Sequence, residues 1–266
     1  DSQEAMRAAR ALGVRSIELE RTAAELRAAN ASLTALLEEK DDFLSRVSHE
    51  MRTPLTAVRS FAELLAEGPH DAARTDRFIG IIAAEADRLT RLLDDILDLA
   101  RLEGGVAPMS MGLLDAREVV LASAAALEGL AEREGVRVKV EEGPPLFVNA
   151  DADRLKQVLV NLISNAIKFH GDVPVVRVSG SVEGEQVVLR VIDEGHGISP
   201  SIRTRLFTKF GGSWGQEKRA GAGLGLAISR QIMARLDGEL ALERTGPDGS
   251  VFAAQLPKAD RIALAS

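Results

Sequence analysis

The 266-residue chain has no cysteine and no tyrosine, a single tryptophan, and only 3% aromatic residues. Without cysteine it forms no disulfide, no thiolate metal site and no cysteine nucleophile. Because aromatic residues are scarce, we expect a core built from leucine, valine, isoleucine and alanine. No apolar run approaches the roughly 20 residues that a membrane span requires. The sequence therefore predicts a globular chain, and we expect a cytoplasmic location for it.

The sequence also has no excess of positively charged residues. The formal net charge is −7 and no basic run occurs, which argues against a nucleic-acid-binding surface and predicts no nucleic-acid partner. The length suits two domains and an extension. Because the sequence starts at Asp1, we expect an excised fragment with a sensor domain upstream.

A seven-residue repeat occupies residues 1–40. One seam consists of Leu12, Leu19, Leu26 and Leu33. The companion seam consists of Ala9, Ala23, Asn30, Leu37 and Leu44, with Ser16 as its weak point. Four to five heptads flanked by glutamate and arginine predict a parallel coiled coil, and a long surface helix is the alternative. Lys40 breaks the leucine series.

The repeat continues without a change of phase into residues 43–58, FLSRVSHEMRTPLTAV. The apolar residues of this segment and its continuation keep a three-then-four spacing: Leu44, Val47, Met51, Val58, Phe61 and Leu65. At about 100° per residue, His49 lies roughly 200° from Val47, so we expect its imidazole to face solvent. Pro54 removes a backbone donor, and we expect the helix to bend just past His49.

A second helix is predicted from Thr75 to Glu103, after a loop over residues 67–74. Its apolar stripe consists of Ile82, Ala86, Leu89, Leu93, Ile96 and Ala100, widened by Leu92, Leu97 and Leu99. Residues 41–107 should therefore form an antiparallel helical hairpin. One partner helix cannot cover so wide a stripe, so we expect a homodimer with a four-helix bundle.

Residues 108–256 mix helical and strand patterns. We expect a capping box at Asp115 and Glu118, followed by one helix to Glu134. Strands are predicted over 136–140, 146–148, 175–182, 186–192, 239–243 and 251–256, and further helices over 151–169 and 223–236. The expected form is an α/β sandwich. Residues 199–220 are typical of a flexible lid, and 257–266 of a loosely held tail.

Polar residues in this region suggest a ligand site. Asn161 and Asn165 are four apart, so both amides lie on one helix face, where a neutral amide oxygen of Asn161 can ligate Mg²⁺. Lys168 follows one turn later and could meet a phosphate. Asp193 ends an apolar strand, and a buried carboxylate needs a donor.

Two glycine clusters belong to the same predicted site. Gly195 and Gly197 let the backbone approach a ligand closely. A second cluster, Gly221, Gly223, Leu224 and Gly225, precedes a helix whose first N–H groups can hold phosphates.

Five segments resemble, in chain order, the motifs of the sensor histidine kinases of two-component systems. The segment HEMRTPL from His49 resembles the H-box. The later boxes are matched by residues 161–169 (N-box), 193–198 and 221–226 (glycine boxes) and 206–210 (phenylalanine box). The resemblance runs from about residue 40 to 256. His170 stands where threonine or serine is common, and residues 246–252 are a loose version of the last glycine box.

The resemblance implies an α plus α/β architecture: a parallel coiled coil, a dimeric four-helix bundle, and an α/β sandwich that binds ATP and Mg²⁺. It implies that His49 is phosphorylated by ATP and donates the phosphoryl group to an aspartate of a response regulator receiver domain. Glu50 would polarise the imidazole, and Thr53 would serve the reverse, phosphatase reaction.

In the nucleotide site, the resemblance implies that Asp193 accepts the adenine amino group and that Phe210 contributes from the phenylalanine box. Phe169 either packs on the adenine or belongs to the core. Because His49 and the nucleotide would lie in different domains, the hinge around Gly104–Gly112 must move.

Two other functions are compatible with these motifs. The chain could be a coiled-coil dimer module that binds nucleotide without transferring phosphate. It could also be an ATPase of the gyrase type, in which water replaces His49 as the nucleophile. The H-box hairpin favours the kinase, because the gyrase, heat-shock chaperone and mismatch-repair ATPases share only the nucleotide-binding fold.

Overall fold

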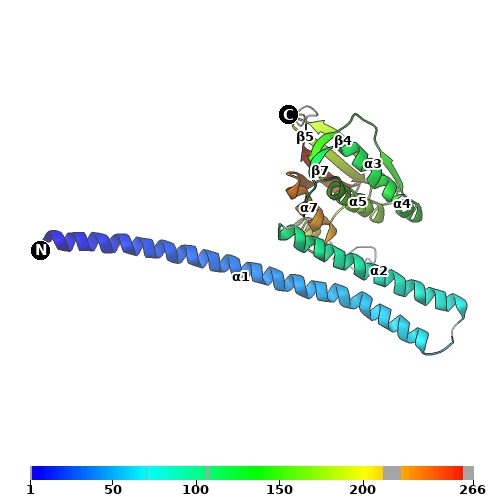
Figure 1. Cartoon of the computed structure of the whole chain (residues 1–266), viewed down its shortest axis with the longest axis horizontal. Helices are drawn as coiled ribbons and strands as arrows, with labels where there is room; N and C mark the ends of the chain where they lie inside the picture. The colour runs from blue at the N-terminus through cyan, green and yellow to red at the C-terminus, as the bar shows by residue number, and fades with distance from the viewer. Residues whose placement is uncertain (1, 70, 106–107, 212–222, 260–266) are drawn as a thin grey trace.

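The computed structural model describes residues 2–69, 71–105, 108–211 and 223–259, with side chains from residue 21 onward except residue 39. Two long helices, α1 (Ser2–Ala66) and α2 (Ala72–Glu103), form a hairpin, and the C-terminal domain sits on α2 (Figure 1). Among the described residues, no helix is long and apolar enough to cross a membrane. The expected order of a helical region followed by an α/β sheet domain is confirmed.

Helix α1 is continuous over 65 residues and contains Pro54 in its interior. Figure 1 shows a gently curved helix rather than two segments joined at a sharp bend, so the bend expected at Pro54 is wrong. Proline removes only the one bond to the carbonyl of Glu50, and Pro54 itself is buried. The coiled-coil seam is at least half exposed in the single chain, at Leu26, Leu33, Leu37 and Leu44.

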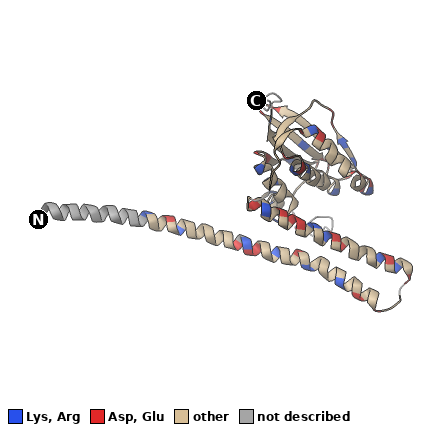
Figure 2. Ribbon diagram, in the orientation of Figure 1, with Lys and Arg blue, Asp and Glu red and all other residues tan. Residues whose placement is uncertain are grey.

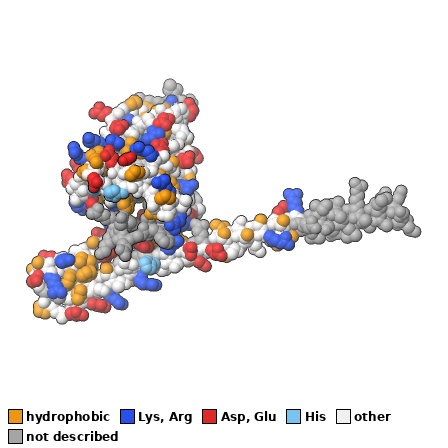
Figure 3. Space-filling model, turned by 180° about the vertical axis from the view of Figure 1, so that it is seen from behind, with side chains coloured by type: hydrophobic (Ala, Val, Ile, Leu, Met, Phe, Trp, Pro, Cys, Tyr) orange, Lys and Arg blue, Asp and Glu red, His pale blue; other side chains and the backbone are white. Residues whose placement is uncertain are grey.

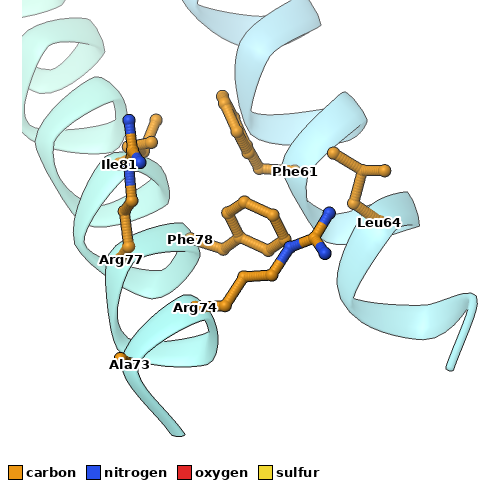
Figure 4. A pocket seen from close by; sticks show the side chains of 7 residues that line it. All are labelled: Phe61, Leu64, Ala73, Arg74, Arg77, Phe78 and Ile81. Atoms are coloured by element: carbon orange, nitrogen blue, oxygen red, sulfur yellow. The ribbon is translucent and has the colours of Figure 1, made fainter. Parts of the chain in front are cut away.

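Helix α2 starts three residues earlier than predicted. Asp71 caps it by accepting a hydrogen bond from the backbone N–H of Arg74 at 2.7 Å, which stabilises the first turn. Near this end the rings of Phe61 and Phe78 lie 5.3 Å apart, and Arg74 covers Phe78 (Figure 4). The two helices border an open groove of about 620 Å³ there, and apolar side chains gather at this end of the hairpin (Figure 3).

The C-terminal domain is built on a five-stranded sheet with the order β2-β4-β5-β7-β6. The strands are β2 (Arg137–Val140), β4 (Val175–Glu183), β5 (Gln186–Asp193), β6 (Glu239–Gly246) and β7 (Gly249–Pro257). Only β2 and β4 pair in parallel. A two-stranded sheet joins β1 (Gly112–Asp115) to β3 (Phe147–Ala150).

One face of the sheet is covered by helices, as expected for an α/β sandwich (Figure 1). The helices are α3 (Ala116–Ala126), α4 (Glu128–Glu134), α5 (Ala152–Lys168) and α7 (Gly225–Arg235), and a short α6 (Pro200–Arg203) follows β5. The predicted apolar face of α5 is buried from Leu155 to Ala166. Aliphatic side chains dominate the core, as the composition indicates.

Three local predictions are wrong. The single helix expected to Glu134 is two helices that break at Leu127, and strand β1 was not predicted. The side chain of Asp115 does cap α3, but it also accepts from the N–H of Leu146 at 2.8 Å and so ties the helix start to the segment before β3. The tail is bonded at its start, since Lys258 and Ala259 donate to the carbonyls of Glu185 and Phe147.

The C-terminal domain docks on the second half of α2, where Figure 2 shows several acidic residues. Leu92, Leu99 and Leu102 of α2 belong to the same buried cluster as the domain core. Around them, Asp98 accepts hydrogen bonds from Arg154 at 2.9 Å and from Gln157 at 2.7 Å. We call these contacts, together with the ion pair between Lys209 and Glu103 at 2.7 Å, the docking interface.

The segment that connects α2 to the C-terminal domain is held by hydrogen bonds at both of its ends. Arg235 of α7 donates to the carbonyls of Leu102 and Gly105, at 3.4 and 3.3 Å. On the other side, the N–H of Ser110 donates to the carboxylate of Asp151 at 2.7 Å. The hinge predicted over residues 104–112 is therefore shorter, because the chain is already attached to the C-terminal domain from Ser110 onward.

Candidate active site

Asp193 lies at the end of β5 and is only 7% exposed. Its Oδ1 accepts hydrogen bonds from the backbone N–H groups of Gly195, at 2.9 Å, and Ser250, at 3.2 Å. Burial raises the pKa of this carboxyl, and the two backbone donors act in the opposite direction. Both bonds use Oδ1, so Oδ2 remains as an acceptor for a donor on a ligand.

The glycines around Asp193 are there because neighbouring backbone leaves no room for a side chain. A Cβ on Gly195 would clash with the carbonyl oxygen of Phe169. Gly197 has a φ of +71°, and a Cβ there would clash with the carbonyl of Gly246. These loops, together with the β6–β7 turn, border a cleft of about 380 Å³ beside Asp193.

Helix α5 carries the predicted amides on the face that meets α7. Asn161 donates through Nδ2 to the hydroxyl of the buried Ser229 at 2.9 Å, and Asn165 lies beside it, with Nδ2 at 3.5 Å from the Asn161 Oδ1. Gly225 is the first residue of α7 and lies next to the Asn161 amide. A Cβ on Gly225 would clash with Asn161 Oδ1. The first turn of α7 and the predicted metal ligand are therefore adjacent.

The second glycine cluster is only partly described. Gly223 has a φ of +73°, which favours glycine, whereas Gly221 lies outside the described residues. Leu224 was predicted to contact the nucleotide, but its side chain is fully buried in the core. Only its backbone remains available to a ligand, so this prediction needs correction.

Phe210 also differs from its predicted role. It is buried, with a φ of +59°, and its ring lies 5.6 Å from that of Phe43 on α1. Lys209 lies over the same Phe43 ring at 5.3 Å. In this structure Phe210 therefore contacts the helical hairpin, whereas Phe207 of the same box packs against Phe252 of β7, with 6.4 Å between the ring centroids.

Two further residues of the N-box segment have distinct surroundings. The pKa of Lys168 is lowered, first by burial and then by the charge of Arg91 on α2. The charges of Asp95 on α2 and Glu134 on α4 act on the pKa in the opposite direction, and the phosphate contact of Lys168 stays a prediction. Phe169 is 43% exposed, so its interpretation as an ordinary core residue is wrong.

His49 is exposed on α1, as predicted. The hydroxyl of Thr53 donates to the His49 carbonyl at 3.3 Å. Glu50 was expected to act on the imidazole, but in this structure its Oε2 accepts from Nη2 of Arg88 on α2 at 3.3 Å. The three H-box residues therefore have three different environments within little more than one helical turn.

Two family models match the chain. The His Kinase A (phospho-acceptor) domain matches residues 39–105, which include the hairpin and His49. The "Histidine kinase-, DNA gyrase B-, and HSP90-like ATPase" model matches residues 150–260, which include Asn161, Asp193 and Gly225. The chain belongs to the histidine kinase family.

Curated relatives agree with this kinase assignment. The sensor protein TorS of Escherichia coli is 32% identical over 91% of this chain and 27% of its own length. The probable sensor histidine kinase TcrY of Mycobacterium tuberculosis is 33% identical, over 90% of this chain and 49% of its own length. DivJ of Caulobacter vibrioides is 34% identical, with 84% and 38% covered. The chain thus spans about a quarter to a half of these relatives.

Solved structures share the fold. Full-length ShkA in complex with AMPPNP is 30% identical, with a TM-score of 0.61 over 81% of this chain and 45% of that one. The histidine kinase ThkA, in complex with the response regulator TrrA, has a TM-score of 0.67 at 24% identity, over 82% of this chain and 61% of that one. At that identity the second likeness concerns the fold alone.

Several residues of this histidine kinase were missed by sequence reasoning. Ser229 was detectable as a small polar residue on the buried face of α7, between Ile228 and Ile232. Asp98 and Arg88 on α2 gave no signal, because a charged residue on a helix is usually a solvated one. Their partners are far along the chain and come close only in the folded structure.

Proposed function

We propose that this chain is the core of an ATP-dependent protein histidine kinase that autophosphorylates His49 and passes the phosphoryl group to an aspartate of a response regulator. The observation that carries the proposal is the presence of an exposed H-box histidine and a built nucleotide site, Asn161 with Asp193, in one chain. The ShkA structure with AMPPNP supports nucleotide binding, and the relative TcrY, a probable sensor histidine kinase, supports the kinase reaction.

The chain's own groups suffice to bind Mg·ATP. Oδ2 of Asp193 accepts the adenine amino group, and the exposed ring of Phe169 stacks on the base. The backbone N–H groups that precede and begin α7, from Gly223 to Gly225, hold the phosphates. Asn161 holds Mg²⁺ through its amide oxygen, with Asn165 beside it. Once bound, the ion neutralises charge on the phosphoryl group that is transferred.

The transfer itself needs His49 in its neutral form, which has a free nitrogen lone pair. That nitrogen attacks the γ-phosphorus in line, a P–N bond forms, and the bond from γ-phosphorus to the β–γ bridging oxygen breaks, which releases ADP. Glu50 accepts or orients the other ring N–H. The phosphoryl group then passes to the aspartate of the regulator, and Thr53 serves the dephosphorylation of that partner.

We further propose that two copies of the chain form the working unit. The half-exposed seam from Leu26 to Leu44 would pair as a parallel coiled coil. The hairpins would pair as a four-helix bundle, which would cover exposed apolar residues such as Leu55, Ile79 and Leu93. The groove near Phe61 and Phe78 lies on this apolar end (Figure 4).

Incubation with γ-labelled ATP tests the proposal. The wild type should acquire an acid-labile label, because a phosphohistidine P–N bond is hydrolysed in acid. His49→Gln should bind ATP and acquire none, while the control His70→Gln keeps the label. Asn161→Asp should stay folded and lose Mg-dependent labelling, since the change is nearly isosteric.

The three candidate functions give different products in this assay. Free phosphate without labelled protein would indicate an ATPase of the gyrase type. Nucleotide binding without either product would indicate a binding module. Acid-labile label on His49→Gln would show that another residue is the nucleophile.

A further inference from the structure

Arg88 joins the two helices of the hairpin at the level of the phosphorylated histidine. Its Nη2 lies 3.3 Å from Oε2 of Glu50 on α1, a residue 38 positions away in the sequence. Its other terminal nitrogen, Nη1, lies 3.8 Å from Oε2 of Glu85, three positions earlier on α2. The guanidinium therefore stands between two carboxylates, one of which belongs to the H-box.

The backbone of α1 is weakened at the same place. Pro54 has no N–H, so the carbonyl of Glu50 loses its donor within the helix. The hydroxyl of Thr53 donates to the neighbouring carbonyl of His49 instead, at 3.3 Å.

In the part of the chain that the structure describes, no hydrogen bond joins Glu50 to the imidazole of His49. The carboxylate of Glu50 is partly buried toward α2, with 24% of the side chain exposed, whereas His49 is exposed. For Glu50 to act on the imidazole, its carboxylate must turn away from Arg88.

We propose that Arg88 is a positioning residue that sets how often Glu50 is available to His49. In one state Arg88 pairs with Glu50 and withholds it. In the other state Glu50 turns to the imidazole and Arg88 pairs with Glu85. This inference rests on the proposed function, because it concerns the rate at which His49 is phosphorylated.

The exchange between the two states costs the ion pair between Arg88 and Glu50, whereas the guanidinium keeps Glu85 as a partner in both states. Ion pairs with this exposure contribute little, which corresponds to about a 1.5- to 5-fold change in an equilibrium constant. Removing Arg88 should therefore raise the autophosphorylation rate by that factor, and removing Glu85 should lower it by a similar factor.

Single-turnover labelling with γ-labelled ATP tests this in the full chain. Arg88→Gln should raise kcat about 1.5- to 5-fold with KM for ATP unchanged, since the charged partners of Arg88 are Glu50 and Glu85 of the helical hairpin. Arg88→Lys should stay near the wild type, because it keeps the charge. Glu85→Gln should lower kcat. The matched control is Arg59→Gln, which removes an exposed arginine that pairs with Glu63 at 3.5 Å on α1 and should change nothing.

A second comparison separates positioning from a structural effect. In a Glu50→Gln background, Arg88→Gln should no longer change kcat, because Arg88 acts through the carboxylate. The inference is overturned if Arg88→Gln lowers kcat, or if its effect persists in that background. If Arg88→Gln does not fold, an unchanged or raised kcat for Glu85→Gln overturns it. A wild type that acquires no label would instead refute the proposed function.

Discussion

Gly225→Ala tests whether Asn161 is the residue that holds Mg²⁺. Gly225 begins α7 directly against the Asn161 amide, so an added methyl would overlap Oδ1 and lie 3.0 Å from Cγ and 3.2 Å from Nδ2. Unstrained contacts between non-bonded carbon atoms need about 3.5–4.0 Å. The amide cannot simply swing aside, because its Nδ2 is bonded to the buried Ser229.

Gly225→Ala should lower the phosphorylation rate strongly and leave the protein folded. Forcing a methyl into a packed site costs about 1–3 kcal/mol, and alanine at a helical position recovers up to about 1 kcal/mol relative to glycine. The net destabilisation should therefore lie between about 0 and 3 kcal/mol. Displacing the Asn161 amide by about 1 Å should lower the phosphorylation rate on the order of 100-fold.

Calorimetric titration with ATP, with and without Mg²⁺, measures the effect directly. Gly225→Ala should lose most of the Mg-dependent part of its affinity, while thermal unfolding shows that it is folded. Gly129→Ala is the matched control, because Gly129 lies on α4 with open space around its Cα. Wild-type Mg-dependent binding by Gly225→Ala would refute the assignment of Asn161 as the metal ligand.

Two further predictions concern the docking interface. Asp98→Ala removes the acceptor of Arg154 and Gln157, so X-ray scattering should show a larger radius of gyration for this variant. The control Asp94→Ala should leave the radius of gyration unchanged. The affinity for ADP should stay the same in both variants. Burial, with the charges of Asp98 and Asp94, raises the pKa of Asp95 from 3.8 to about 6. Protonated Asp95 therefore adds to the free energy of unfolding below about pH 4, and this contribution is lost as the pH rises through 6. Asp95→Asn should remove this part of the pH dependence of thermal unfolding, about 1 kcal/mol after solvent screening, and an unchanged profile would contradict the burial argument.

The residues that the sequence predicted well depend on local chemistry. The apolar face of α5 was predicted from its spacing, and the position of Asp193 from the apolar strand before it. The glycines were predicted from the close approaches that such loops require, and the structure shows backbone within reach of a Cβ at Gly195 and Gly197. Each of these signals lies within one element and its flanking loop.

The errors share a different origin, namely packing between the two domains. Phe210, a residue of the predicted nucleotide site, contacts Phe43 of the helical hairpin. Periodicity cannot reveal contacts between segments more than 70 residues apart. The break at Leu127 was missed for another reason, because the nearby Gly129 lies inside α4 and does not mark the break itself.

The anchoring of Ser110 to Asp151 limits how far the nucleotide site can travel. Only residues 104–109 connect the end of α2 to the first attached residue of the C-terminal domain. Six extended residues span at most about 20 Å. On so short a tether the ATP-binding domain is present at an effective concentration in the millimolar range around its own hairpin, whatever the concentration of protein in solution. In the proposed reaction, the short connection would therefore keep the nucleotide and His49 close together at any protein concentration.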